Sequence, residues 1–326
     1  MATRNPIVRV VASVASRVWF PAARFTSRNL PRRWMHAGAR VLAGAYYRLR
    51  PKYLRAARAN LAIILRLPAD SPEVRRLSFD MVSSHFHAWV DFLHFATRPP
   101  ADAARLIEGV VGYSHIVEGR LRGKGVLLVT AHLGNWEIGG LMLAKVNQPI
   151  HIVLVPDIFP GVERERRRLH ASRGVHEIRV DRSFVTPLAI LRALGENAIV
   201  AVQGDRDFNN TGLAVRFFGR ETFFPRGPLL LAMASGATVL PAFIVRLPDG
   251  RYRAVVEDPL KIDADGDRDE ALRRNIERYV AILERYVREY PDQWYCFYPF
   301  WDDPSRRAPP PAPPFRVSGS KFRDGS

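Results

Sequence analysis

Residues 125–140 read GVLLVTAHLGNWEIGG and join a buried strand to a group of polar side chains. The apolar and β-branched run 126–130 is short and continuous, which is typical of a strand covered on both faces of a sheet. His132 follows at the carboxyl end of this strand, the edge at which open α/β sheets bind ligands. Glycines at 134, 139 and 140 permit close approach of the backbone. This stretch therefore predicts a ligand site at the edge of an α/β sheet.

The rest of the chain predicts an α/β fold with a mixed central sheet flanked by helices. Outside the opening stretch, strands are expected at 149–155, 198–202, 238–245 and 252–256. Helices are expected at 136–145, 161–173, 186–194, 227–235 and 269–290, and residues 34–98 are mainly helical. Alternating strands and helices of this kind imply one sheet with covering helices. The predicted organisation is a membrane-surface segment (1–33), a catalytic domain (34–303) and a disordered Pro-rich tail (304–326).

Positive charge is concentrated at the N-terminus. The chain carries a formal net charge of +17, and the first acidic residue is Asp70, which follows 14 basic residues. Such an excess indicates a polyanionic partner, either nucleic acid or an anionic membrane surface. Residues 7–20 have apolar side chains on one helical face and end in Trp19 and Phe20, which predicts an in-plane amphipathic anchor. The alternative is a basic helix packed on its own domain.

Two simple features limit the class of protein further. Cys296 is the only cysteine, so an intramolecular disulfide and a thiolate zinc cluster are excluded. No apolar run reaches the roughly 18 residues of a membrane-spanning helix. We therefore expect a peripheral or monotopic protein in a reducing compartment.

His132 and Glu137 suggest acid–base chemistry. A neutral imidazole can accept a proton from an attacking hydroxyl, and a carboxylate on its other nitrogen fixes the tautomer. If Asn135 caps the next helix, Glu137 in its first turn can face back toward His132. No Ser or Cys lies beside the pair to act as a nucleophile. Direct attack of a hydroxyl on the substrate is therefore more natural than a covalent acyl-enzyme intermediate. The alternative is a strand-end histidine satisfied by the backbone.

Four sequence blocks resemble one enzyme family. They are His132–Glu137 (His-x4-Glu), Gly204–Phe208 followed by Val215–Gly219, Phe224–Pro228 and Val239–Phe243. In this order they resemble the lipid A biosynthesis acyltransferase branch of the lysophospholipid acyltransferase superfamily, over residues 40–301. Asp292–Tyr295 is similar to the Gln-Trp segment with which this family ends. Its members acylate lipid A precursors, phosphatidylinositol mannosides and related glycolipids.

The resemblance implies roles for individual residues. His132 would be the general base and Glu137 its partner. Asp205 would assist His132 or hold the acceptor hydroxyl, and Arg206 would bind phosphate or the donor. Asn135, Arg226 and Gly227 would complete the substrate site.

Two departures leave the acceptor open. Phe-Pro-Arg-Gly at 224–227 differs from the Pro-Glu-Gly of glycerolipid acyltransferases, and residues 295–298 lack the His-Arg-Arg of many lipid A enzymes. The implied reaction is transfer of a fatty acyl group from acyl-ACP or acyl-CoA to a lipid hydroxyl. No metal or cofactor is expected, and the implied place is the cytoplasmic face of the inner membrane.

Weaker patterns allow other interpretations. His87, Asp91 and His94 share a helical face and could bind a metal, although their neighbours are those of a helix in apolar surroundings. The charge-rich stretch 163–173 predicts a solvated face with i, i+3 and i, i+4 pairs, or a docking surface for an acidic carrier protein or for coenzyme A phosphates. A non-catalytic lipid-binding scaffold and a nucleic-acid-binding protein remain as rivals. The latter is disfavoured because the charge lies in an apolar-striped N-terminus.

Overall fold

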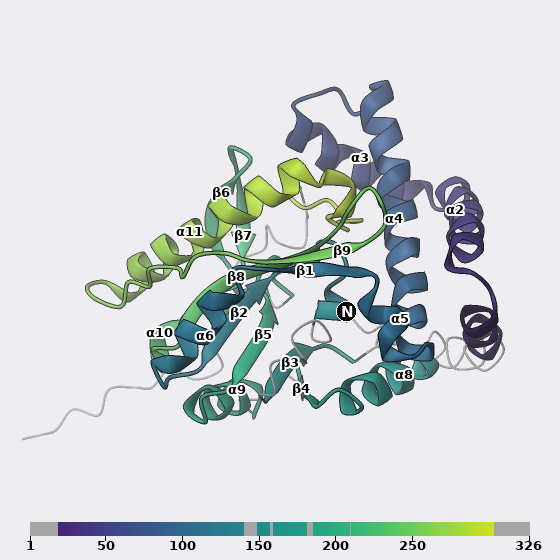
Figure 1. Cartoon of the computed structure of the whole chain (residues 1–326). Coiled ribbons are helices and arrows are strands. Elements are labelled where there is room, and N and C mark those ends of the chain that lie inside the picture. Colours follow the sequence, from purple (N-terminus) through teal and green to yellow (C-terminus); the bar gives the residue numbers. More distant parts are fainter. Residues whose placement is uncertain (1–18, 140–148, 157–158, 181–184, 209, 303–326) are drawn as a thin grey trace, which may run out of the picture.

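The N-terminal third of the described chain is helical. The computed structural model describes residues 19–139, 149–156, 159–180, 185–208 and 210–302. The helices of this part are residues 19–29, α2 (Arg32–Leu49), α3 (Pro51–Leu65), α4 (Pro72–Thr97) and α5 (Pro100–Ala104). α4 starts where Ser71 accepts a hydrogen bond from the amide of Val74 and Pro72 occupies the first turn. α2 and α3 both pack against this long helix (Figure 1).

The core of the fold is a seven-stranded sheet. Its strands are β1 (Ile107–Val111), β2 (Val126–Thr130), β3 (Ile150–Leu154), β4 (Val175–Arg179), β5 (Ile199–Gln203), β8 (Thr238–Arg246) and β9 (Tyr252–Val256). The spatial order is β1-β9-β8-β2-β5-β3-β4. The β8–β9 pairing is antiparallel and the others are parallel, so the sheet is mixed as predicted. A separate antiparallel hairpin consists of β6 (Leu213–Phe217) and β7 (Arg220–Phe224).

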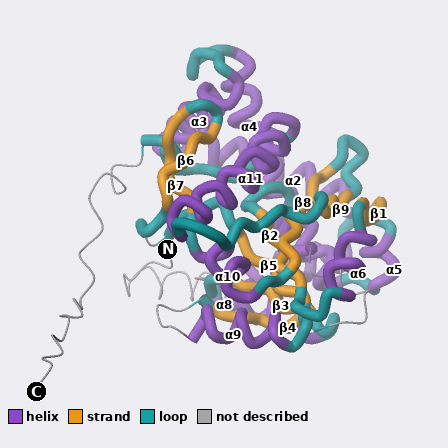
Figure 2. Tube along the Cα trace, turned by 90° about the vertical axis from the view of Figure 1, so that its left-hand side faces the viewer, coloured by secondary structure: helices purple, strands orange, loops and turns teal. Residues whose placement is uncertain are grey.

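Helices lie on both faces of this sheet. They are α6 (Tyr113–Leu121), α8 (Pro160–Ala171), α9 (Val185–Gly195), α10 (Gly227–Ser235) and α11 (Arg268–Glu289). α9, α10 and α11 pack on one face and build the largest apolar core. α6 covers part of the other face, while α8 packs against β4 and α4. Figures 1 and 2 show the resulting layers, with α11 running along the sheet and α4 beyond its end.

The predicted strands and most of the predicted helices are confirmed to within about two residues. The helix expected at 136–145 is described only at its start, as the 3-10 helix η1 (Trp136–Ile138), because residues 140–148 lie outside the described part. The proposed tail and most of the predicted anchor also lie outside it. Among the described residues, no helix is both long and apolar enough to cross a bilayer.

Candidate active site

His132 and Asp205 meet at the carboxyl edge of the sheet. β2 and β5 are adjacent and parallel, and Thr130 pairs with Gln203 at their last positions. His132 and Asp205 each lie two residues beyond the end of their strand, and His132 Nδ1 lies 2.7 Å from Asp205 Oδ1. The strand register therefore brings two residues that are 73 positions apart in sequence into one dyad.

Asp205 is held ionised although its side chain is completely buried. Its Oδ2 accepts hydrogen bonds from the backbone N–H of His132 at 3.1 Å and from the Trp294 indole at 3.2 Å. Burial alone would raise the pKa of Asp205, but the hydrogen bonds from the side chain and backbone of His132, together with the nearby Arg206 guanidinium, hold this pKa below its usual value. A buried carboxylate is stable here because donors surround it.

His132 is a neutral imidazole in this setting. Burial lowers its pKa below 6.5, and Arg206 lowers it further, against the opposing effect of Asp205. Since the carboxylate can only accept, Nδ1 carries the proton and Nε2 carries a lone pair. The aromatic rings of Trp136 and Phe208 contact the imidazole edge-on. This arrangement is suited to a general base.

A C-terminal segment holds the backbone on either side of Leu133 through hydrogen bonds. The 3-10 helix η3 (Pro291–Gln293) is followed by Tyr295, whose amide donates to the carbonyl of His132 at 3.0 Å. The Gly134 amide donates to the carbonyl of Gln293 at 2.9 Å. Gly134 has φ +65°, and a Cβ there would lie 1.7 Å from the carbonyl oxygen of Ile244. Only glycine fits this turn, which sets the direction of the chain after His132.

His132 lines a mainly apolar cavity of about 260 Å³. Its wall includes the side of the sheet that α6 leaves uncovered, with Leu128, Ile152, Ala201 and Ala242. The polar residues that line the cavity are Thr130, His132, Glu137, Arg166, His170 and Gln203. An apolar cavity with a few polar groups beside a histidine fits a ligand with an alkyl chain and one reactive end.

Glu137 does not contact the imidazole, which corrects the geometry expected from the sequence. Its two carboxylate oxygens accept from Arg166 Nε and Nη2 at 2.8 and 2.9 Å, a bidentate pair. η1 turns Glu137 toward α8, so that Asp205 takes the place at Nδ1. Glu137 still lines the cavity, on the side of Arg166.

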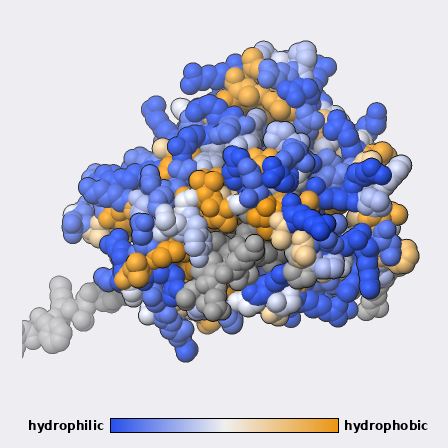
Figure 3. Space-filling model, viewed as in Figure 1, coloured by the Kyte–Doolittle hydropathy of each residue, from blue (hydrophilic) through white to orange (hydrophobic). Residues whose placement is uncertain are grey.

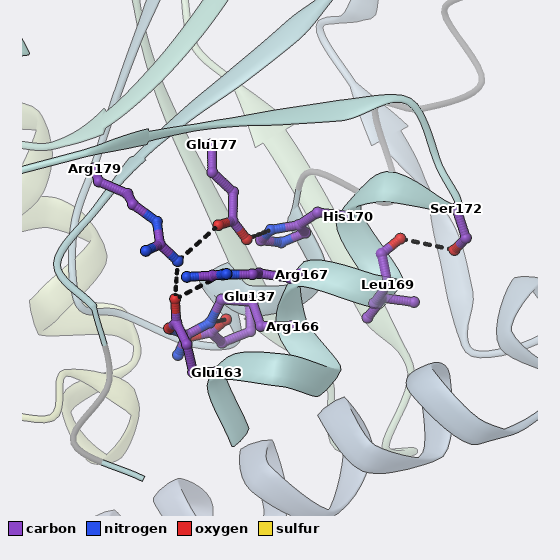
Figure 4. Close-up of polar contacts among 9 residues, drawn as sticks. All are labelled: Glu137, Glu163, Arg166, Arg167, Leu169, His170, Ser172, Glu177 and Arg179. Atoms are coloured by element: carbon purple, nitrogen blue, oxygen red, sulfur yellow. Dashed lines mark hydrogen bonds and ion pairs between the residues drawn. The ribbon is translucent and has the colours of Figure 1, made fainter. Parts of the chain in front are cut away.

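The charge-rich stretch around α8 forms a connected network (Figure 4). Arg167 pairs with Glu163 and Arg168 with Glu165 at the predicted i, i+4 and i, i+3 spacings. Glu177 accepts from His170 and lies near Arg179, which also reaches Glu163. Arg166 is not solvated as predicted for this stretch, because its side chain is only 6% exposed. It lies on the helix face that carries Val162 and Leu169, and an arginine within an apolar stripe is the signal that sequence reasoning missed.

The other predicted binding residues are divided among several places. Asn135 makes no cap to η1; its amide donates to the carbonyl of Ala88 at 3.1 Å. Arg206 donates to the Tyr295 carbonyl at 2.6 Å. Arg226 pairs with Asp269, and neither Arg226 nor Gly227 is among the residues that line the described cavity. The structure thus groups His132, Asp205 and Glu137 and leaves Arg226 and Gly227 apart.

Asp91 joins α4 to the N-terminal helices. It receives a bidentate pair from Arg32 at 2.6 and 2.8 Å, and a hydrogen bond from Tyr252 at 2.6 Å. His36 also contacts it at 2.8 Å. These partners give the buried carboxylate a structural role at this junction. In the part of the chain that the structure describes, no group of three His, Cys, Asp or Glu side chains could hold a metal ion.

Comparisons with known proteins identify the family to which the chain belongs. The model of the bacterial lipid A biosynthesis acyltransferase family matches residues 12–302. A phosphatidylinositol mannoside acyltransferase of Mycolicibacterium smegmatis is 27% identical over 264 residues, which is 79% of this chain and 83% of the relative. A protein of the same description from Mycobacterium tuberculosis (strain CDC 1551 / Oshkosh) is 27% identical over 243 residues, 73% of this chain and 74% of the relative. The chain belongs to the bacterial lipid A biosynthesis acyltransferase family.

Proposed function

We propose that the protein transfers a fatty acyl group from acyl-ACP or acyl-CoA to a hydroxyl of a glycolipid, with His132 as general base and Asp205 as its partner. The observation that carries this proposal is the buried His132–Asp205 dyad beside an apolar cavity. Asp205 replaces Glu137 as the group that fixes the tautomer, because its carboxylate contacts Nδ1.

The proposed step is direct. His132 Nε2 accepts the proton as the acceptor oxygen attacks the thioester carbon, and the carbonyl electron pair moves onto oxygen. When the tetrahedral intermediate collapses, the C–S bond breaks and the thiolate leaves. It takes up the proton from the imidazolium, whose charge Asp205 has stabilised.

The names of the relatives support a choice of acceptor class. Both relatives described above are named for acylating phosphatidylinositol mannoside. We propose a mannosylated phosphoinositide, or a glycolipid of similar chemistry, in preference to a lipid A precursor.

Transfer assays with purified protein test the function. Labelled acyl-ACP and acyl-CoA are each supplied with phosphatidylinositol mannoside, with a lipid A precursor, or with no acceptor. We expect label in the mannoside at least 10-fold above that in the lipid A precursor. Folded protein that binds these lipids but transfers from neither donor would instead support the rival of a lipid-binding scaffold.

We also propose that α2 lies on the membrane surface. Trp34, Val41, Leu42 and Leu49 are 60–76% exposed. Their spacing of i, i+7, i+8 and i+15 places them on one face of the helix. The opposite face, with Ala39 and Ala43, is buried.

In Figure 3 apolar residues also gather over the neighbouring α3, within a mostly hydrophilic face. Exposed Arg33 and Arg48 would add attraction to an anionic leaflet, such as the cytoplasmic face of an inner membrane.

Replacing Trp34 and Leu42 together by serine should weaken binding to phosphatidylglycerol vesicles about 100-fold or more, since each buried side chain contributes roughly 1.5–3 kcal/mol. Cosedimentation measures the partition. Val117→Ser with Leu121→Ser on α6 is the matched control, because both residues are exposed apolar side chains away from α2. Equal losses in the two double variants would argue against a specific role of α2.

A further inference from the structure

Thr130 and Gln203 form a second side-chain pair beside the dyad. They face each other across β2 and β5, and both line the cavity that contains His132. Each lies two residues before a member of the dyad, at the last position of its strand. The previous positions on the same face of the two strands are Leu128 and Ala201, which are apolar. The Thr130–Gln203 pair thus lies at the boundary between the dyad and the apolar part of the cavity.

Two atoms of this pair have unused hydrogen-bonding capacity. Among the described residues, Thr130 Oγ1 and Gln203 Nε2 are shielded from water and have no hydrogen-bond partner. The backbone around them is satisfied, since the Thr130 carbonyl accepts from the Gly204 amide and the Tyr279 hydroxyl. Burying a donor without a partner is unfavourable, and such atoms in native structures call for an explanation.

We propose that Thr130 and Gln203 hold the carbonyl oxygen of the thioester donor and stabilise the oxyanion that forms on it. This inference rests on the acyl-transfer function proposed above. A threonine hydroxyl and a glutamine amide both donate, so together they suit an acceptor oxygen that gains negative charge.

The spacing along the strands suits this role. One two-residue step along a strand is about 7 Å. The reacting atoms form a path from the imidazole nitrogen, through the attacking oxygen, the carbonyl carbon and the carbonyl oxygen, to the donor that holds this oxygen. With a hydrogen bond of about 2.8 Å at each end, the length of this path is close to that span. The alkyl chain beyond the carbonyl would then lie against Leu128, Ala201 and Ile152, which line the same cavity.

In the proposed step the carbonyl π pair moves onto the oxygen between Thr130 and Gln203 as the new C–O bond forms. The same pair returns when the C–S bond breaks. The donors therefore bind the transition state more strongly than the substrate, so their loss should lower kcat more than it raises KM.

Steady-state kinetics with a straight-chain acyl donor tests the assignment. Gln203→Leu should lower kcat about 100-fold and Thr130→Val about 10-fold, with KM for the donor changed less than about 3-fold. Thr130→Ser keeps the hydroxyl and should stay within about 3-fold of wild type. Ile152→Ala is the matched control; it changes an apolar lining residue and should alter KM or chain-length preference instead.

A binding experiment separates this proposal from the proposed function. Calorimetry compares a coenzyme A acyl analogue that keeps a carbonyl beside a non-cleavable carbon linkage with an S-alkyl analogue that lacks it. Wild type should prefer the carbonyl analogue roughly 5-fold, and Gln203→Leu should lose the preference. This result would support the site even if wild type transferred no acyl group. Unchanged kcat in a folded Gln203→Leu variant, or the same preference in both proteins, would overturn it.

Discussion

Replacing His132 by alanine is expected to lower kcat about 1,000-fold with little change in KM for either substrate. His132 lines the cavity, and its Nδ1 is held by Asp205, which leaves Nε2 as the ring nitrogen that can accept a proton. General-base catalysis by a positioned side chain contributes roughly 10²–10⁴-fold, and its loss affects the transition state alone. Single-turnover transfer from a labelled donor measures this step directly.

The control for this variant is stability. Asp205 would lose its closest partner, so thermal unfolding of His132→Ala is compared with that of His132→Gln, which keeps an amide in the site. Both variants should bind vesicles like wild type, because α2 is remote in sequence and packs on α4. A folded His132→Ala protein that retains a tenth or more of the activity would contradict base catalysis.

Replacing Asp205 by asparagine is expected to lower kcat about 1,000-fold as well, through the tautomer of His132. Oδ2 of Asp205 accepts from two N–H donors, the His132 backbone and the Trp294 indole. Asparagine would satisfy these donors with its oxygen and turn its NH₂ toward Nδ1. Nδ1 would then have to accept, the proton would move to Nε2, and the base would be lost.

The pH dependence gives this prediction a second readout. Because the pKa of His132 is lowered from 6.5, the acid limb of the wild-type rate profile should lie below pH 6.5. Asp205 opposes this lowering, so its loss moves the pKa and the acid limb of residual activity to still lower pH. An unchanged acid limb in Asp205→Asn would contradict the coupling.

Glu137→Gln is the matched control that separates the two carboxylates. It weakens the pair with Arg166 and leaves the contact at Nδ1 intact. We expect this variant to be less stable than wild type, since removing one partner of a shielded ion pair is costly. Its kcat should fall far less than that of Asp205→Asn. A loss equal to that of Asp205→Asn at unchanged stability would restore the sequence hypothesis for Glu137.

Much of the sheet could be predicted because its central strands are continuous apolar runs. β2 is buried on both sides over its first four residues and β5 over its first two, and their apolar sequences show this directly. β1 contains Glu108 and Gly109 at the sheet edge and carries no such signal. The β6–β7 hairpin carries no clear strand pattern in the sequence, because Arg216 and Glu221 interrupt its apolar residues.

The partner of His132 depends on information that a linear pattern does not contain. The spacing between His132 and Glu137 would bring the carboxylate to the imidazole only if a regular helix started directly after Asn135. The 3-10 helix η1 forms there instead. Choosing Asp205 requires knowing that β2 and β5 are neighbours and pair at Thr130 and Gln203. Strand order follows from tertiary packing, so the sequence offers Asp205 as one possible assistant of His132 but does not decide between that role and contact with the acceptor hydroxyl.

The C-terminal segment also sets the order in which a newly made chain becomes an enzyme. The backbone of His132 is held by the Tyr295 amide, and Asp205 by the Trp294 indole. The ribosome adds about 5–20 residues per second, so these two residues follow α2 (Arg32–Leu49) by roughly 12–50 s. The surface proposed to meet the membrane would emerge first, and the dyad would be sealed last. On the proposed function, a nascent chain would expose its membrane-facing helix before its dyad could act on a thioester.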